Sequence, residues 1–216
     1  MSLDVLKLLR WVIPGVILAV MLEPLLHITE LAAKYHWPDL LGYPASIIVF
    51  GVFYDVLDLR RLAFERPLAK INRNIEDSLL ACCSSSPDVV AASSYLRQER
   101  RLMNVFYAVV DNDKSLTEKS KRVRANGFIW SSLADLQVLG AIGAAVYLVG
   151  AAISRSGVYL VTSLCLIALV ILTRLVFMPM TTKKHLRLST EQLEMIEQQH
   201  RQEVCDLIAA LVDAAP

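Results

Sequence analysis

The sequence lacks the short motifs that carry most known enzyme chemistry. It has no HExxH zinc motif, no GxSxG nucleophile elbow, no phosphate-binding glycine loop and no paired CxxC. Its four histidines, including His27 and His200, are scattered along the chain. We therefore expect no catalytic site, no metal site and no cofactor.

The net charge is close to zero, and cysteines are few. The 22 Lys and Arg residues nearly balance 21 Asp and Glu, which leaves a net charge of +1 and no bulk attraction to nucleic acid. We expect no direct nucleic-acid partner. The four cysteines, Cys82, Cys83, Cys165 and Cys205, form neither a disulfide framework nor a metal pattern. We expect a reducing compartment for those outside the membrane.

Apolar residues are abundant: 55% of the chain is hydrophobic, above the 45–50% typical of soluble domains. Four apolar segments occur, at 11–28, 41–57, 128–153 and 157–178. A transmembrane helix needs about 17–25 such residues, which the last two segments supply. The first two are marginal and could instead be buried core helices. We predict an all-α polytopic membrane protein with four transmembrane helices and a cytoplasmic helical extension.

Lysine and arginine are distributed unevenly about these segments. Thirteen lie between the second and third segments, two precede the first and four follow the last, whereas the loops inside the two hairpins carry only Lys34 and Arg155. Loops rich in Lys and Arg stay in the cytoplasm. We expect a multi-pass protein of the inner (plasma) membrane with both termini cytoplasmic. No small-residue cleavage site follows the first segment, which we expect to be retained.

Four parts follow from this pattern: a hairpin at 1–57, a cytoplasmic insertion at 58–127, a second hairpin at 128–178 and an amphipathic tail helix at 179–216. The insertion contains three signals for helix boundaries. Pro67 predicts a kink or restart, Ser86 before Pro87 predicts the cap of a helix over 88–110, and Ser115 begins a capping box.

The tail also carries a cap-like stretch, LSTEQ at 188–192, and one apolar stripe. A helical stripe of this kind has to be buried on something. Its cover could be the helices of the insertion, a neighbouring subunit or a separate cytoplasmic protein, and we expect it to bind a partner. The stripe consists of Leu193, Ile196, Val204, Leu207 and Leu211.

Charged residues inside the apolar segments are candidate functional residues. Asp135 lies 20 residues before Arg155 in the second hairpin, and Arg174 lies 19 residues after it. At about 1.5 Å of rise per residue the two reach the same depth, so we expect Arg174 to pair with Asp135, with Asp55 as a second candidate partner. The pair could anchor the helices or gate an ion path.

Glu23 and His27 form a second candidate site, on the outer side of the membrane. Their spacing of four residues brings them to one helix face, where a proton-linked pair is conceivable. We expect the chain around them to turn into an interfacial amphipathic helix.

Small and polar residues recur along the third segment at helical spacing. Close helix packing in a membrane relies on such residues. They could pack against other segments of the same chain or against a second subunit, and we favour the second interpretation. This face comprises Ala134, Gln137, Gly140, Ala141, Gly143, Ala144, Gly150 and Ala151.

Two basic clusters in the insertion could bind lipid headgroups or an anionic ligand. Without a phosphate-binding loop, the alternative is a solvated helix face. The clusters are Lys119, Lys121, Arg122 and Arg124, and Arg97, Arg100 and Arg101.

The sequence thus favours a non-enzymatic protein that oligomerises and couples a cytoplasmic signal or partner to the bilayer. Only its layout is similar to that of small bacterial inner-membrane effectors and sensors, some of them pore-forming and some acting in antiviral defence. One alternative is a membrane scaffold that recruits a soluble enzyme or nuclease. The other is a small ion or proton-linked transporter that uses Glu23, although the two hairpins show no internal repeat.

Overall fold

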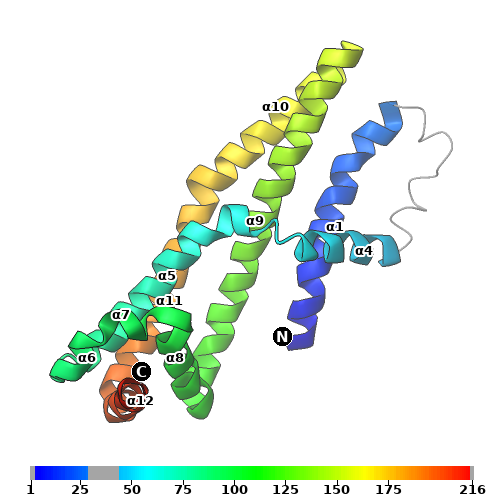
Figure 1. The fold of residues 1–216 in the computed structure, drawn as a ribbon. Coiled ribbons are helices and arrows are strands. Elements are labelled where there is room, and N and C mark those ends of the chain that lie inside the picture. The colour runs from blue at the N-terminus through cyan, green and yellow to red at the C-terminus, as the bar shows by residue number, and fades with distance from the viewer. Residues whose placement is uncertain (1–2, 29–43, 215–216) are drawn as a thin grey trace. The chain divides into compact units, whose positions relative to one another are not determined.

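The computed structural model describes residues 3–28 and 44–214, and every regular element in these ranges is a helix (Figure 1). The all-α prediction is confirmed. The chain forms two compact units. Unit 1 comprises Met1–Glu65 and Phe128–Thr181, and unit 2 comprises Arg66–Gly127 and Thr182–Pro216.

In unit 1, α1 (Leu3–Ile28) crosses α4 (Pro44–Val56) at a pair of glycines. A Cβ atom on Gly51 would overlap the carbonyl oxygen of Trp11, and one on Gly15 would overlap the carbonyl oxygen of Ile47. Only glycine lets two helix backbones approach this closely. The two helices are apolar over short stretches only, Leu8–Met21 and Ile47–Val56.

The second hairpin of unit 1 joins α9 (Lys114–Ser154) to α10 (Gly157–Leu172) through a turn in which Arg155 has φ 53°. The buried Ser163 hydroxyl donates to the Ala144 carbonyl at 2.8 Å and ties the two helices together. Among the described residues, two helices are long and apolar enough to cross a membrane: Lys114–Ser154 and Gly157–Gln199. A four-span topology stays a prediction.

The helix that contains the fourth apolar segment continues beyond the predicted end of that segment at residue 178. α10 continues through the π-helical turn η2 (Thr173–Phe177) into α11 (Met178–Gln199). The predicted helix start at 188–192 is wrong, because the Thr190 hydroxyl bonds back to the Leu186 carbonyl at 3.0 Å and caps no new helix.

The insertion also breaks at other places than predicted. α5 (Arg61–Cys82) continues past Pro67 without a break, and the chain turns earlier, where Asp58 has φ 48°. Aspartate tolerates this left-handed conformation, whereas Pro67 removes one backbone donor and crowds the carbonyl of Ala63, and the helix continues in spite of both. The predicted restart at Pro67 is therefore wrong.

Several short helices replace the single one predicted over 88–110. They are α6 (Pro87–Ala91), α7 (Ser93–Leu96), η1 (Gln98–Arg100) and α8 (Arg101–Asn112). Ser86 is the N-cap residue of α6, as predicted, although its side chain makes no capping hydrogen bond. Glu99 and Arg100, with φ of 51° and 59°, interrupt the predicted helix.

The cap of α9 is Asp113 rather than the predicted Ser115. The Asp113 carboxylate accepts the Leu116 N–H at 2.8 Å and the Ser115 hydroxyl at 2.5 Å. These two donors hold the pKa of Asp113 below its usual range, the Ser115 hydroxyl contributing most.

The tail is part of unit 2. α12 (Arg201–Asp213) contacts α6, α7 and α8, and a disulfide joins Cys205 to Cys83 with an S–S distance of 2.10 Å. The expectation that the cysteines outside the membrane are reduced is wrong for this pair. The fold brings the two together from opposite ends of unit 2, which the spacing of cysteines along the chain does not show.

Candidate functional site

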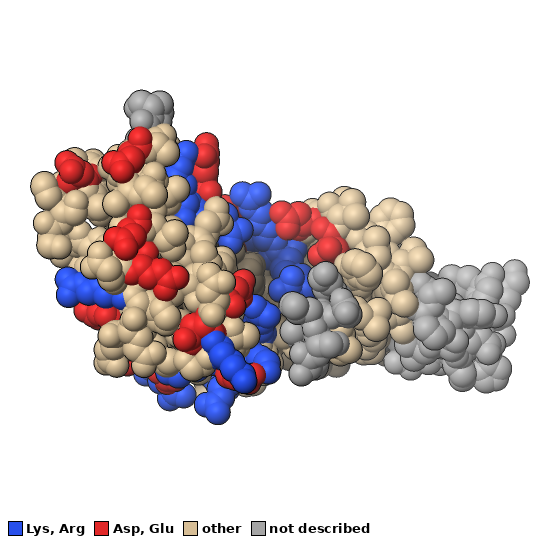
Figure 2. All heavy atoms as spheres, turned by 90° about the horizontal axis from the view of Figure 1, so that it is seen from below, with Lys and Arg blue, Asp and Glu red and all other residues tan. Residues whose placement is uncertain are grey.

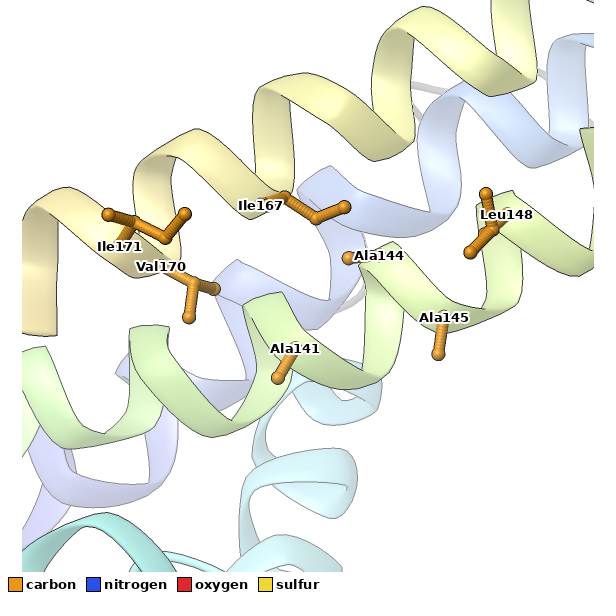
Figure 3. A pocket seen from close by; sticks show the side chains of 7 residues that line it. All are labelled: Ala141, Ala144, Ala145, Leu148, Ile167, Val170 and Ile171. Carbon is orange, nitrogen blue, oxygen red and sulfur yellow. The ribbon is translucent and has the colours of Figure 1, made fainter.

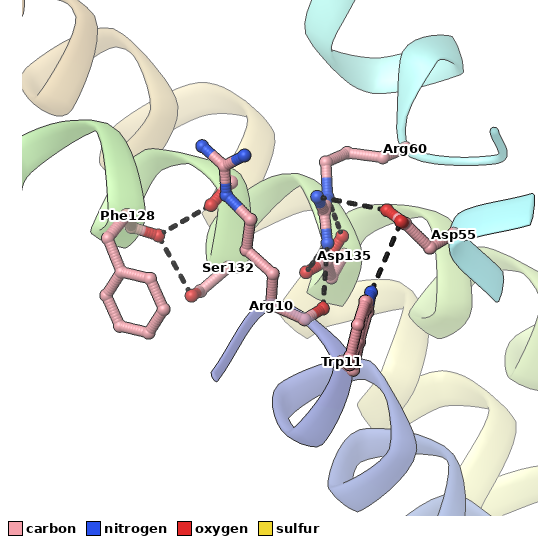
Figure 4. A network of polar contacts seen from close by, with 8 residues as sticks. Arg10, Trp11, Asp55, Arg60, Phe128, Ser132 and Asp135 are labelled. Atoms are coloured by element: carbon pink, nitrogen blue, oxygen red, sulfur yellow. Dashed lines mark hydrogen bonds and ion pairs between the residues drawn. The ribbon is translucent and has the colours of Figure 1, made fainter. Parts of the chain in front are cut away.

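Among the residues that the structure describes, the most enclosed ion pair of unit 1 joins Arg60 to Asp135 (Figure 4). Arg60 Nε donates to Asp135 Oδ1 at 2.7 Å and Arg60 Nη2 donates to Asp135 Oδ2 at 3.1 Å. The Asp135 side chain is 2% exposed and that of Arg60 is 15% exposed. A two-pronged pair of this kind is strong in a site that excludes water.

Neighbouring groups extend this pair into a network. Asp55 Oδ1 lies 3.7 Å from Arg60 Nη1, and Asp55 Oδ2 accepts Trp11 Nε1–H at 3.3 Å. The Arg10 carbonyl accepts Arg60 Nη2–H at 3.2 Å. Residues from α1, α4, the turn after α4 and α9 thus converge on one guanidinium. The network fixes helices to one another and contains no arrangement of nucleophile and base.

Arg60 therefore occupies the place that the sequence assigned to Arg174. The structure pairs Asp135 with Arg60, and the Asp55 carboxylate also lies beside Arg60, so the predicted Arg174–Asp135 pair does not form. Arg174 is exposed and has no ion-pair partner among the residues that the structure describes. Matching depth along two helices does not fix which way each side chain faces.

Arg174 lines a groove of about 400 Å³ within unit 1, which we call the Arg174 groove. Its polar lining residues are Arg174 and Gln137. Gln137 is 6% exposed, and its Nε2 has no hydrogen-bond partner in the described part of the chain. The apolar walls include Leu62, Val138, Ile142 and Val170.

A second groove, of about 290 Å³, runs between α9 and α10 and is apolar (Figure 3). Its α9 side consists of Ala141, Ala144, Ala145 and Leu148, and Ile167 lies on the opposite side. The small α9 side chains leave the groove open.

Much of the predicted small-residue face is used inside the chain. A Cβ atom on Gly140 would lie 2.8 Å from Val170 Cγ2, and one on Gly143 would lie 3.2 Å from Leu166 Cδ1 and from Met21 Sδ. Gly150 faces the Tyr159 ring. Ala134, Gln137 and Ala144 are buried, Gly143, Gly150 and Ala151 are half-buried and Ala141 is exposed. A contact with a second subunit is left to the exposed flank of α9.

The basic clusters are largely neutralised by partners within unit 2. Arg97 contacts Asp77 at 2.5 Å and Glu76 at 3.4 Å, and Arg101 contacts Glu99 at 2.6 Å. Acidic and basic side chains are intermixed over the face shown in Figure 2. This arrangement favours the alternative interpretation, a solvated surface.

The second basic cluster shows the same pattern. Lys121 contacts Glu118 at 2.6 Å, Arg124 contacts Asp111 at 3.5 Å, and Lys119 donates to the Glu191 carbonyl at 3.3 Å. Arg122 and Arg100 are exposed and have no ion-pair partner within the described ranges.

The predicted tail stripe is mostly buried within unit 2. Leu193, Ile196 and Val204 are buried, Leu211 is half-buried, and Leu207 is 37% exposed. The stripe is therefore covered by its own unit and is not a free partner-binding surface. Ile208, which the sequence-based stripe omits, is fully buried.

Two further predictions concern the Glu23–His27 site and metal binding. Glu23 and His27 lie in α1, and their side chains fall outside the described residues. Within the described ranges, no group of three or more His, Cys, Asp or Glu side chains could hold a metal ion. Arg60 was not predicted from the sequence, although it lies just beyond the second apolar segment, five residues after Asp55.

Comparisons with protein-family models, with curated proteins and with solved structures gave no match to this chain.

Proposed function

We propose that this chain is a non-enzymatic membrane protein that oligomerises and couples a cytoplasmic signal or partner to the bilayer. One observation carries the proposal: the most apolar stretch of Gly157–Gln199 is only 11% buried, and that of Lys114–Ser154 only 33%. A core helix of a soluble protein would be mostly buried. Apolar surface left open on this scale needs lipid or another protein to cover it.

Coupling is supported by helices common to both units. α5, α9 and α11 each begin in one unit and end in the other. A stiff helix transmits a displacement along its axis, so a partner bound to unit 2 could shift the α9–α10 hairpin. We extend the proposal to four membrane segments, with unit 2 in the cytoplasm, on the strength of the Lys and Arg distribution.

Alkaline extraction of membranes tests the first step. We expect the chain to stay in the membrane pellet at high pH and to need detergent for release. Release into the soluble fraction at high pH would overturn the proposal. Ion leakage from liposomes that contain the reconstituted protein would identify the pore-forming version. Liposomes that retain their ions while the protein binds a partner would identify a sensor.

Self-association is proposed through the open flank of α9. Ala145 is exposed beside the groove of Figure 3, where a small side chain lets a second helix approach. We expect Ala145→Leu to lower the oligomer mass in native mass spectrometry. Ser154→Leu, at an exposed site on the opposite face of the same helix, is the matched control and should leave the mass unchanged.

The scaffold alternative is favoured by a different observation. Val90, Tyr107 and Leu207 are large apolar side chains exposed on unit 2. A soluble enzyme could dock there. Charged substitutions at these three positions, which spare the buried members of the tail stripe, should then abolish co-purification of the soluble protein and leave membrane insertion intact.

A further inference from the structure

The Arg174 groove combines an uncompensated charge, a buried amide and apolar walls. We propose that it binds an anionic phospholipid, whose phosphate contacts Arg174 and Gln137. The inference rests on the proposed membrane location of unit 1 and goes beyond the coupling function. It also gives Arg174 an anionic partner in place of Asp135, which pairs with Arg60.

The polar lining residues match a phosphate. Arg174 is exposed on η2 and has no carboxylate partner among the described residues, and no acidic residue lines the groove. A guanidinium offers parallel N–H donors that fit two phosphate oxygens. An unpaired arginine at lipid depth is costly, and an anion relieves that cost.

Gln137 supplies a second, independent indication. Its side chain is more than nine-tenths buried, and its Nε2 donor has no partner in the described part of the chain. A buried donor left unpaired is destabilising, and the terminal torsion of glutamine rotates easily. Rotation can bring the amide N–H into the groove that Gln137 already lines.

The walls decide between a lipid and a free anion. Val138, Ile142 and Val170 give the groove an apolar lining that a soluble phosphate ion would leave uncovered. An acyl chain covers such a surface favourably. A zwitterionic lipid carries a cationic group beside its phosphate and would bring this positive charge toward Arg174. The occupant is therefore an amphiphile with net negative charge, such as a phosphatidylglycerol.

The test uses the full chain, purified in detergent after it has been shown to resist alkaline extraction. Mixed micelles carry equal amounts of phosphatidylglycerol and phosphatidylcholine, and native mass spectrometry counts the lipids retained. We expect selective retention of phosphatidylglycerol by the wild type. Arg174→Gln and Gln137→Glu should each lower that selectivity about five-fold or more, the factor that one charge provides near a membrane.

Arg155→Gln is the matched control, since it removes an exposed arginine at the far end of the hairpin, and it should keep the wild-type selectivity. Arg174→Lys should retain part of it, which separates loss of charge from misfolding. Equal losses in Arg155→Gln, or none in Arg174→Gln, would overturn the proposal. So would displacement of the lipid by millimolar inorganic phosphate, which would identify a free anion as the occupant. Release of the chain into the soluble fraction by alkaline extraction would instead reject the membrane function itself.

Discussion

Arg60 and Asp135 form a two-pronged ion pair between the turn after α4 and the middle of α9. We expect Asp135→Ala or Arg60→Ala to lower the free energy of unfolding by about 3–5 kcal/mol, because each leaves the other charge enclosed without a partner. Melting curves in detergent would measure this. The double variant should lose less than the sum of the single variants.

The neighbouring pair Arg61–Glu65 serves as the control, since both side chains are about two-thirds exposed. Glu65→Gln should change the stability by less than about 0.5 kcal/mol. Arg174→Ala should also leave it nearly unchanged. If Arg174→Ala destabilises the protein as much as Arg60→Ala does, the pairing seen in the structure is not the one in the membrane.

The glycine crossing of α1 and α4 gives a second prediction. Gly51→Ala places a methyl group against backbone at Trp11, which cannot rotate away, so we expect a loss of about 3 kcal/mol or more. Gly157→Ala is the control, because nothing lies within 4 Å of its Cβ position. Equal melting temperatures for the two variants would show that α1 and α4 do not cross at these glycines.

The Cys83–Cys205 disulfide should stabilise unit 2 by about 2–5 kcal/mol, because it joins residues 122 positions apart. Cys83→Ser should lower the melting temperature, and Cys165→Ser, at an exposed free cysteine, should not. Alkylation under denaturing conditions should find two free thiols before reduction and four after it. Four free thiols in acid-trapped, unreduced protein would contradict the bond.

A pH effect is expected from His185, which is half-buried in unit 2 with its Nδ1 lying 3.4 Å from Asn126 Nδ2. Burial lowers its pKa below the usual 6.5, so the unfolded chain binds a proton that the folded chain resists. Stability should therefore fall as the pH drops from 7.5 to 5.5. His185→Gln should flatten this part of the melting profile, and an unchanged slope would exclude the histidine.

The helical class and several helix boundaries follow from the sequence, because apolar spacing and Ser86 before Pro87 act locally. The partner of Asp135 could not be predicted in that way. The depth of a residue in the membrane depends on residue count alone, whereas the direction of its side chain depends on the rotation of the helix about its axis. The π-turn at Thr173–Phe177 also alters that rotation just where Arg174 lies.

The disulfide was out of reach for a related reason. Cys83 and Cys205 meet only because α12 packs in unit 2, and no local signal records that contact. Leu193, Ile196 and Val204 are likewise buried in unit 2, although the sequence could assign them to a partner as easily as to the chain itself. Amphipathic stripes predict burial and do not name the surface that provides it.

The bond also bears on topology. Persistent disulfides belong to oxidising compartments, whereas the Lys and Arg distribution assigns unit 2 to the cytoplasm. The two indications disagree, and we retain the charge distribution because it involves many residues along the whole chain. The side of the membrane on which unit 2 lies therefore decides both the topology and whether the disulfide can persist.

The most direct measurement is labelling of cysteines introduced one at a time into a Cys82→Ser, Cys165→Ser background that keeps the Cys83–Cys205 disulfide. The reagent is a membrane-impermeant maleimide, applied to intact cells and after permeabilisation. Arg155→Cys reports the turn between α9 and α10, and Glu194→Cys reports an exposed site on unit 2. The account predicts that Arg155→Cys is labelled in intact cells and that Glu194→Cys is labelled only after permeabilisation. Labelling of both positions from the same side would contradict a hairpin that crosses the membrane.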